Sequence, residues 1–287
     1  MQPPVVRTSS ALRARMTAFA DSRKRTALVP TMGALHDGHL SLVRIAKRAA
    51  DRVIVSIFVN PAQFAPGEDF EAYPRDTADD LAMLAEEGVD LVYLPEPGSI
   101  YAADHTTQVI VGGVGDGLET DHRPTFFHGV ALVVNKLINR AAPDFAVFGE
   151  KDYQQLCVIR RMVRDLDMPV EIIGGPIARD AHGLALSSRN RYFDEAGLTL
   201  ARQFNVVLQD SVAAIETGQT VDTSLKNARS RLLDAGFDAV DYVSLADAQS
   251  LAPVDEAKPS HALRLLAATH CHGVRLIDNF PVKRPAD

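Results

Sequence analysis

The sequence predicts an α/β protein built on a doubly wound parallel sheet and followed by a smaller α+β domain. The stretch RVIVSIFVN at 52–60 is rich in β-branched residues and apolar on both faces, as a central strand of a parallel sheet is. Such stretches alternate with segments whose apolar residues recur at helical spacing. After about residue 179 the alternation gives way to a polar loop, two helical stretches and short strands. We therefore place one domain at residues 1–178 and a second at 179–287.

The first domain begins with a helix over Ser10–Ala20, for which Ser9 or Ser10 is a suitable N-cap. A strand at 26–29 then leads to a helix that starts near His39. The remaining elements of this domain are a strand at 52–60, a helix at 77–87 closed by a glycine, extended segments at 89–95 and 106–113, a helix at 130–141, a strand at 144–149, a helix at 153–166 and a strand at 170–173.

The second domain is predicted to contain two helices and three short strands. The helices lie near 195–217 and 225–235, and the strands lie within 237–247, 261–270 and 273–279. Ligand sites in doubly wound sheets lie at the carboxyl ends of the strands. We therefore expect the site in the loops that follow Val29, Asn60, Phe148 and Ile173.

Composition narrows the class of function. The 287 residues are 46% hydrophobic and 23% charged, with a net charge of −7, which argues against a nucleic-acid or membrane-surface binder. The N-terminal stretch lacks the apolar region of a secretory signal, and no run of about eighteen apolar residues occurs. The two cysteines, Cys157 and Cys271, form no metal-like or redox-like pair. We expect a cytoplasmic protein.

The stretch VPTMGALHDGHLSLVRIAKRA at 29–49 is predicted to handle phosphate. Pro30 should stop the strand, and Gly33 and Gly38 permit a tight turn before the helix. A helix start offers unpaired N–H groups to an anion, and His36 and His39 flank this one. The pair could also ligate a metal, but a zinc site needs further ligands and no Cys or His cluster lies nearby. Two solvated loop histidines are the remaining alternative.

Two more anion-binding candidates lie in predicted loops. Lys151 follows a strand end, and Ser187, Ser188 and Arg189 form a compact group of donors between the domains. Taken alone, Lys151 could be a solvated loop lysine and the serines an N-cap for the next helix. The common nucleotide motifs are absent: there is no G-x-x-x-x-G-K-[ST], and the glycines at 112–117 do not fit G-x-G-x-x-G, so an NAD site is not expected.

Five of these loops, taken together, resemble one family. VPTMGALHDGH, FVNPAQF, EDFEAYPRD, FGEKDYQQL and HGLALSSRN occur in the order and at the spacing of the pantothenate synthetases, the pantoate–β-alanine ligases of the nucleotidylyltransferase superfamily, and RLIDN follows near the end. The resemblance implies a Rossmann-like domain that binds ATP and pantoate, a C-terminal lid domain and a homodimer. It also implies that pantoate's carboxylate attacks ATP to give pantoyl adenylate and pyrophosphate, and that β-alanine then expels AMP. Mg²⁺ would accompany ATP.

The resemblance also assigns residues to roles. His39 would be the catalytic proton donor, His36 would stabilise charge beside it, and Lys151 would lie on the phosphates. Gln63 and Gln155 would bind pantoate and lie near β-alanine. The residues implied for ATP binding are Met32, Gly33, Ala34, Leu35, His36, Asp37, Gly38, His39, Gly149, Glu150, Lys151, Asp152, Ala178, Leu186, Ser187, Ser188 and Arg189. No protein side chains are assigned to a metal.

The chain departs from the family pattern in one corner of the expected pocket. The family typically has R-P-x-H-F-x-G-V where this chain has RPTFFHGV, so Phe126 replaces a histidine, and His128 is two residues away. Asp79 and Asp80 begin the helix after EAYPRD. A metal role is conceivable for them, but a solvated helix N-terminus explains them better.

Two other functions are consistent with these residues. A related nucleotidylyltransferase could act on another small acceptor, although the neutral amides of Gln63 and Gln155 favour a small hydroxy acid over a phosphorylated acceptor. A catalytically silent nucleotide-binding regulator would not be expected to keep His39, Lys151 and the Ser187–Arg189 group.

Overall fold

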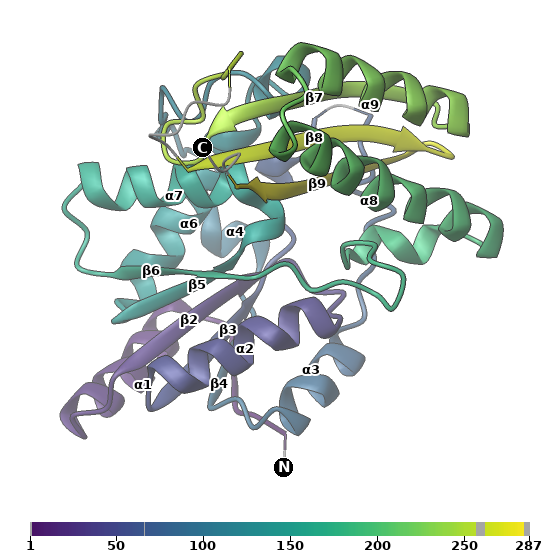
Figure 1. The fold of residues 1–287 in the computed structure, drawn as a ribbon. Coiled ribbons are helices and arrows are strands. Elements are labelled where there is room, and N and C mark those ends of the chain that lie inside the picture. The colour runs from purple at the N-terminus through teal and green to yellow at the C-terminus, as the bar shows by residue number, and fades with distance from the viewer. Residues whose placement is uncertain (1, 66, 257–261, 284–287) are drawn as a thin grey trace.

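The computed structural model describes residues 2–65, 67–256 and 262–283, which form two sheets and the helices around them (Figure 1). Within these residues a six-stranded parallel sheet has the order β1-β4-β3-β2-β5-β6, and a three-stranded antiparallel sheet has the order β7-β8-β9. The strands are β1 (Val5–Val6), β2 (Thr26–Thr31), β3 (Arg52–Ile57), β4 (Leu91–Tyr93), β5 (Phe145–Gly149), β6 (Glu171–Gly175), β7 (Ala239–Asp247), β8 (Leu263–Cys271) and β9 (Val274–Val282). The predicted fold class, a doubly wound α/β domain with a smaller α+β part, is confirmed.

Helices cover both faces of the large sheet. The helices of the described residues are α1 (Ser9–Asp21), α2 (Asp37–Ala49), α3 (Thr77–Glu86), α4 (Pro97–Ile100), α5 (Glu119–His122), α6 (Phe126–Ala141), α7 (Tyr153–Asp165), α8 (Glu195–Glu216) and α9 (Val221–Ala235), with the short 3-10 turns η1 (Pro61–Gln63), η2 (Glu150–Asp152) and η3 (Ser188–Tyr192). Leu28 and Ile54 pack with α1, α6 and α7, whereas Val29 and Val55 pack with α2 and α3. Successive residues of a strand thus bury opposite faces.

The strand order places a crevice between β2 and β5. β3 and β4 continue the sheet on one side of β2, and β5 and β6 continue it on the other. β2 pairs with β3 along its whole length but with β5 only at Ala27 and Leu28, so the carboxyl ends of β2 and β5 separate. This is the point at which doubly wound sheets bind ligands.

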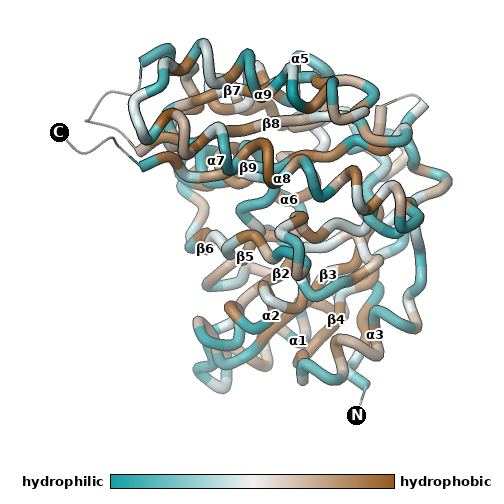
Figure 2. Tube along the Cα trace, turned by 45° about the vertical axis from the view of Figure 1, so that its right-hand side comes forward, coloured by the Kyte–Doolittle hydropathy of each residue, from teal (hydrophilic) through white to brown (hydrophobic). Residues whose placement is uncertain are grey.

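The small sheet and its helices lie over the large sheet (Figure 1). α8 and α9 pack with β7, β8 and β9 around a core of their own. Figure 2 shows hydrophobic colour along the strands of both sheets and mixed colour on the helices that cover them. Leu266 of β8 and Ala246 of β7 join the core of the large sheet, which ties the two sheets together.

Several predicted boundaries are wrong. Pro30 does not stop β2, which continues to Thr31. Thr31 O accepts from Phe58 N on the β3 side, so by alternation the nitrogen of Pro30 faces the other side, where pairing with β5 has already ended. α1 starts one residue early, because Thr8 Oγ1 rather than a serine accepts from Ala11 N.

Two further boundaries differ. α2 begins at Asp37, with His36 as its N-cap, rather than near His39. The segment 106–113 is not a strand: Val109 and Val111 pack against the core of the large sheet, but the backbone pairs with none of the described strands. Position 261 of the predicted 261–270 strand lies outside the described residues, and β8 accounts for the rest from Leu263.

A glycine permits the close packing of α6 against η1. A Cβ at Gly129 would lie 2.0 Å from the carbonyl oxygen of Ala62, a contact that backbone atoms cannot relieve cheaply. Asn60 Nδ2 also donates to Gly129 O at 3.1 Å, so this contact places the loop after β3. The loop carries Gln63.

We expect Gly129→Ala to lower the free energy of unfolding by about 1–3 kcal/mol, in chemical denaturation, because the added methyl overpacks a backbone contact. Helix propensity alone would favour alanine by about 1 kcal/mol, so a loss identifies the clash. Gly98→Ala is the matched control: a Cβ there meets nothing within 4 Å. Equal stability of the two variants would contradict the packing argument.

Candidate active site

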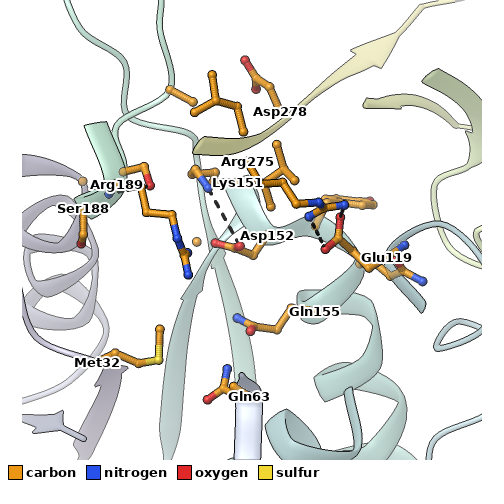
Figure 3. Close-up of a pocket in the computed structure, with 18 of the residues that line it drawn as sticks. Met32, Gln63, Glu119, Lys151, Asp152, Gln155, Ser188, Arg189, Arg275 and Asp278 are labelled. Carbon is orange, nitrogen blue, oxygen red and sulfur yellow. Dashed lines mark hydrogen bonds and ion pairs between the residues drawn. The ribbon is translucent and has the colours of Figure 1, made fainter. Parts of the chain in front are cut away.

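A cavity of about 720 Å³ lies between the two sheets, at the crevice between β2 and β5. Its lining residues come from the loops after β2, β3, β5 and β6, from α6, and from β8 and β9. Figure 3 shows Ser188 and Arg189 on one side, Glu119 and Arg275 on the opposite side, and Lys151 and Asp152 between them. The prediction that the site lies at strand carboxyl ends is confirmed.

The turn after β2 is held by a buried carboxylate. Gly33 and Ala34 have positive φ values of 80° and 51°, a conformation that is costly for alanine. Ala34 N and Leu35 N donate to Asp80 Oδ2 and Oδ1 at 3.1 and 2.7 Å. The interpretation of Asp80 as part of a solvated helix N-terminus is therefore wrong, since Asp80 is 2% exposed and caps this turn, whereas Asp79 is exposed as expected.

The carbonyl groups of the same turn are bonded from the opposite direction. Ser188 Oγ donates to Ala34 O at 2.9 Å, and Arg191 Nη2 donates to Leu35 O at 2.7 Å. Both donors come from η3, in the loop that precedes α8. The turn is thus fixed between α3 on one side and η3 on the other.

The N–H groups expected to receive an anion are largely engaged within the protein. Ala34 N and Leu35 N are bonded to Asp80, Gly38 N donates to His36 Nδ1 at 3.1 Å, and His39 N donates to His36 O at 2.8 Å. The expectation that the helix start offers these backbone donors does not hold for the four groups. An anion in the cavity must be met mainly by side chains.

The two histidines lie side by side at the cavity wall, with ring centroids 4.1 Å apart. Burial, helped by the nearby Lys151 and Arg191, lowers the pKa of His36 to about 4. Burial, helped by His36, Lys151 and Arg191, lowers the pKa of His39 to about 3. Both imidazoles are therefore neutral at pH 7.

The tautomer of His36 follows from its hydrogen bond. Its Nδ1 accepts from Gly38 N, so the ring hydrogen is on Nε2. His39 Nδ1 is buried and has no hydrogen-bond partner among the described residues. Neither ring is a freely solvated loop histidine.

Lys151 lies in η2, directly after β5, and lines the cavity with Gly149 and Asp152. Its Nζ is 4.0 Å from Asp152 Oδ1, and its side chain is 21% exposed. It is therefore a half-buried cation at the end of a central strand. The alternative of a solvated loop lysine does not fit this burial.

The donors at the start of η3 also reach the cavity, and each has a protein partner. Arg189 donates from Nε and Nη2 to both carboxylate oxygens of Asp69, at 2.9 and 2.7 Å. Ser187 Oγ accepts from Arg189 N at 3.3 Å, as an N-cap of η3, and Ser188 bonds to Ala34. Asp69 belongs to the EDFEAYPRD motif but was not singled out as a site residue.

The two glutamines lie together at one end of the cavity (Figure 3). Gln63 Oε1 accepts from Asn60 Nδ2 at 2.9 Å, and Asn60 Oδ1 accepts from Tyr101 Oη at 2.7 Å. Asn60 is 1% exposed, so these two hydrogen bonds fix the orientation of the Gln63 amide. Its Nε2 end is left to donate to ligand oxygens.

Phe126 gives its corner of the cavity a different chemistry. The Arg123 guanidinium carbon lies 3.8 Å from the centroid of the Phe126 ring, and Arg123 donates to both oxygens of Glu68 at 2.7 Å. His128 lines a separate cavity of about 210 Å³ and does not replace the missing donor. A stacking surface for Arg123 thus stands where the family pattern has a histidine.

Not every predicted residue reaches the cavity wall. Gly33, Ala34 and Leu35 act behind the wall through their backbone, Asp37 is exposed at the start of α2, and Glu150 faces away to Arg264 Nη2 at 3.0 Å. The predicted residues that line the cavity are Met32, His36, Gly38, His39, Gln63, Gly149, Lys151, Asp152, Gln155, Ala178, Leu186, Ser187, Ser188 and Arg189. The carbonyl oxygen of Ala178 accepts from Leu186 N at 2.9 Å.

The described residues hold no group of three or more His, Cys, Asp or Glu side chains arranged to bind a metal ion. In the same part of the chain, none of the helices combines the length and apolar character needed to cross a bilayer.

We expect Asp80→Asn to lower the free energy of unfolding by about 1–3 kcal/mol, because an amide NH₂ would replace one of two buried acceptors and leave an N–H unpaired. Asp79→Asn is the matched control, one residue away and exposed, and should change stability by less than about 0.5 kcal/mol. Chemical denaturation of both variants measures this. A loss at Asp79 equal to that at Asp80 would refute the capping role.

The chain is similar to known proteins over nearly its whole length. The family model described as pantoate-beta-alanine ligase matches residues 4–281. A pantothenate synthetase from Mesorhizobium japonicum is 53% identical over 98% of both chains. The crystal structure of pantothenate synthetase from Thermus thermophilus is 40% identical, with a TM-score of 0.90 over 96% of this chain and 98% of that one.

A third similar protein was solved with ligands. The crystal structure of pantoate-beta-alanine ligase from Francisella tularensis, complexed with beta-gamma ATP and beta-alanine, is 30% identical, with a TM-score of 0.82 over 97% of each chain. Its similarity to this chain therefore extends from the fold to the sequence. From its sequence and its fold together, this chain belongs to the pantoate–β-alanine ligase family.

Proposed function

We propose that this chain ligates (R)-pantoate and β-alanine to give pantothenate at the expense of ATP, through a pantoyl adenylate, with release of AMP and pyrophosphate. The observation that carries the proposal is the composition of the large cavity. Two imidazoles line the cavity together with Lys151 and Arg189, and the neutral amides of Gln63 and Gln155 lie together at one end of it. Family membership supports the same reaction.

The reaction needs two chemically different steps at one place. A carboxylate is a poor acyl donor until one of its oxygens becomes part of a good leaving group, which transfer of the adenylyl group from ATP provides. The pantoate carboxylate attacks the α-phosphorus and pyrophosphate leaves. The amine of β-alanine then attacks the acyl carbon and AMP leaves. Lys151 and Arg189 stabilise the phosphate oxygens during the first step.

His39 acts by donating a hydrogen bond from a neutral ring, not as a positively charged imidazolium. Because the pKa of His39 is lowered to about 3, its ring is neutral at pH 7. A neutral imidazole can still donate an N–H to an oxygen that gains charge in the transition state. His36, held in one tautomer by Gly38 N, supports the same oxygens.

Mg²⁺ would bind together with ATP, through the phosphates of the nucleotide. Mg²⁺ is commonly held by substrate phosphates, several waters and one or two carboxylates rather than by an all-protein cage. The carboxylate of Asp152 lines the cavity beside Lys151 and suits such a role. When bound, the ion would neutralise phosphate charge.

The acceptor end of the cavity favours a small hydroxy acid over a phosphorylated acceptor. The labelled side chains at this end are the neutral amides of Gln63 and Gln155 (Figure 3). The uncommitted Nε2 of Gln63 suits a hydroxyl or carboxylate oxygen. A related nucleotidylyltransferase with a phosphate acceptor would be better served by arginine or lysine side chains in place of these amides.

We further propose that residues 179–287 act as a lid over residues 1–178, that two copies form a homodimer, and that the protein works in the cytoplasm. The lid is supported by the contacts of η3 with the turn after β2. The other two follow from the family resemblance.

With purified protein and ATP, we expect pyrophosphate to form only when pantoate is present, because the pantoate carboxylate is the nucleophile of the first step. Addition of β-alanine should then allow turnover and AMP release. Pyrophosphate release driven by β-alanine alone would exclude this order, and activity with a phosphorylated acceptor instead of pantoate would favour the alternative transferase. Binding of ATP without any product would favour a regulator.

We expect Arg189→Ala to lower the rate of pyrophosphate release in a single turnover by about a hundredfold, and to weaken ATP binding less, because a preorganised donor contributes most in the transition state. Arg202→Ala is the matched control: Arg202 also forms an ion pair, with Asp180 at 3.0 Å, but does not line the cavity. A large loss of ATP affinity with an unchanged chemical step would reduce Arg189 to a binding residue.

A further inference from the structure

The RLIDN segment at 275–279 lies on β9 and bonds to three separate parts of the chain. Arg275 donates to Glu119 of α5, and Asp278 accepts from both Nη atoms of Arg179 at 2.6 and 2.8 Å. Asn279 contacts η2, the turn that carries Lys151. The first two contacts are ion pairs between elements, whereas the third reaches the main chain of a site residue.

The amide of Asn279 is fully used and fully buried. Its Nδ2 donates at 2.9 Å to the carbonyl oxygen of Glu150 and at 2.9 Å to that of Lys151, and the residue is 1% exposed. Two successive carbonyl groups are thus bonded by the two hydrogens of one NH₂ group. A carboxylate or a hydrocarbon at this position could not satisfy them.

Arg264 fixes the orientation of this amide. Its Nε donates to Asn279 Oδ1 at 2.6 Å, and its Nη2 lies 3.0 Å from Glu150 Oε2. The Arg264 guanidinium carbon is 3.8 Å from the centroid of the Tyr153 ring, at the start of α7. Because Oδ1 faces a guanidinium, Nδ2 is directed at the turn.

The η2 turn is short and has few stabilising bonds within itself. η2 has three residues, and its N-cap is Gly149, which has no side chain to cap the turn. Lysine is a flexible side chain, so the place of its ammonium group depends on where its backbone is fixed. The bonds from Asn279 supply that constraint from the other domain.

We propose that Asn279 is the positioning residue for Lys151: its amide, oriented by Arg264, holds the Glu150 and Lys151 carbonyl groups so that the Lys151 ammonium meets the phosphates of ATP. The inference rests on the proposed function, in which Lys151 stabilises the first step. It also links the placement of the small sheet to the active site, since a shift of β9 would move this turn.

A double-mutant cycle tests the proposal with the full-length protein, because coupled residues give non-additive losses. The four proteins are wild type, Asn279→Ala, Lys151→Ala and the double variant. The measurement is single-turnover pyrophosphate release with ATP and pantoate. We expect Asn279→Ala to slow the step by about ten- to a hundredfold, as a misplaced catalytic group does. In the Lys151→Ala background it should cause no further loss.

A matched control separates positioning from stability. Thr269 is 0% exposed on the neighbouring strand β8, and its Oγ1 donates to the carbonyl oxygen of Ala239 at 2.7 Å. Thr269→Val removes a buried bond from side chain to main chain in the same sheet, so it should lower the melting temperature and leave the rate unchanged. If Asn279→Ala does not fold, Asn279→Asp keeps the size and the Arg264 contact but removes both donors, and it takes the same place in the cycle.

Three outcomes would overturn the proposal. The first is a near-wild-type rate for the folded Asn279 variant. The second is an equal fold-loss on removing Asn279 with and without Lys151, which would mean that Asn279 acts elsewhere. The third is full activity of Lys151→Ala, which would also remove Lys151 from the proposed function. In the second outcome Lys151 keeps its role, so the two failures are distinguishable.

Discussion

The active site depends on one short piece of main chain, the turn at Ala34 and Leu35, whose polar groups are bonded from two sides. Asp80 accepts both N–H groups, while Ser188 and Arg191 donate to both carbonyl groups. Burial raises the pKa of Asp80, although the two N–H groups favour its ionised form. This arrangement holds a costly positive-φ alanine and places the two histidines at the start of α2. It also explains why side chains, rather than the turn's own amides, face the cavity.

Arginine side chains that line the cavity are paired with carboxylates, although the protein is acidic and its proposed substrates are anions. The net charge is −7, so a strongly anionic substrate must be drawn by local groups. Arg189 is paired with Asp69, and Arg123 with Glu68. Such pairs hold the guanidinium groups in place without leaving buried cations uncompensated. Lys151 is paired less closely, because its Nζ lies 4.0 Å from Asp152 Oδ1. Its ammonium group is therefore more available to phosphate than either guanidinium group.

Much of the fold and part of the cavity wall could be predicted from the sequence, and the errors have physical causes. RVIVSIFVN is apolar on both faces because its strand is central. The segment 106–113 also contains apolar residues, but it pairs with none of the described strands. The sequence shows the apolar pattern of a segment and does not show which strand it pairs with. Asp80 looks like an ordinary acidic residue at a helix start, and only the packing of α3 against the turn makes it buried. Phe126 was recognised as a departure, but its stacking on Arg123 depends on the pocket geometry.

Long-range contacts connect the small sheet and η3 to the loops of the active site. Strand β9 reaches α5 through Arg275, the start of the second domain through Asp278 and the Lys151 turn through Asn279, while η3 reaches the turn after β2. The contacts of Asn279 and of η3 end on the turns after β5 and β2, at the carboxyl edge of the large sheet. If residues 179–287 close as proposed above, their movement would act on the turn before α2 and on the turn that carries Lys151. The small sheet in this way bonds to several loops at once, and it supplies the supporting hydrogen bonds that a site built on loops needs.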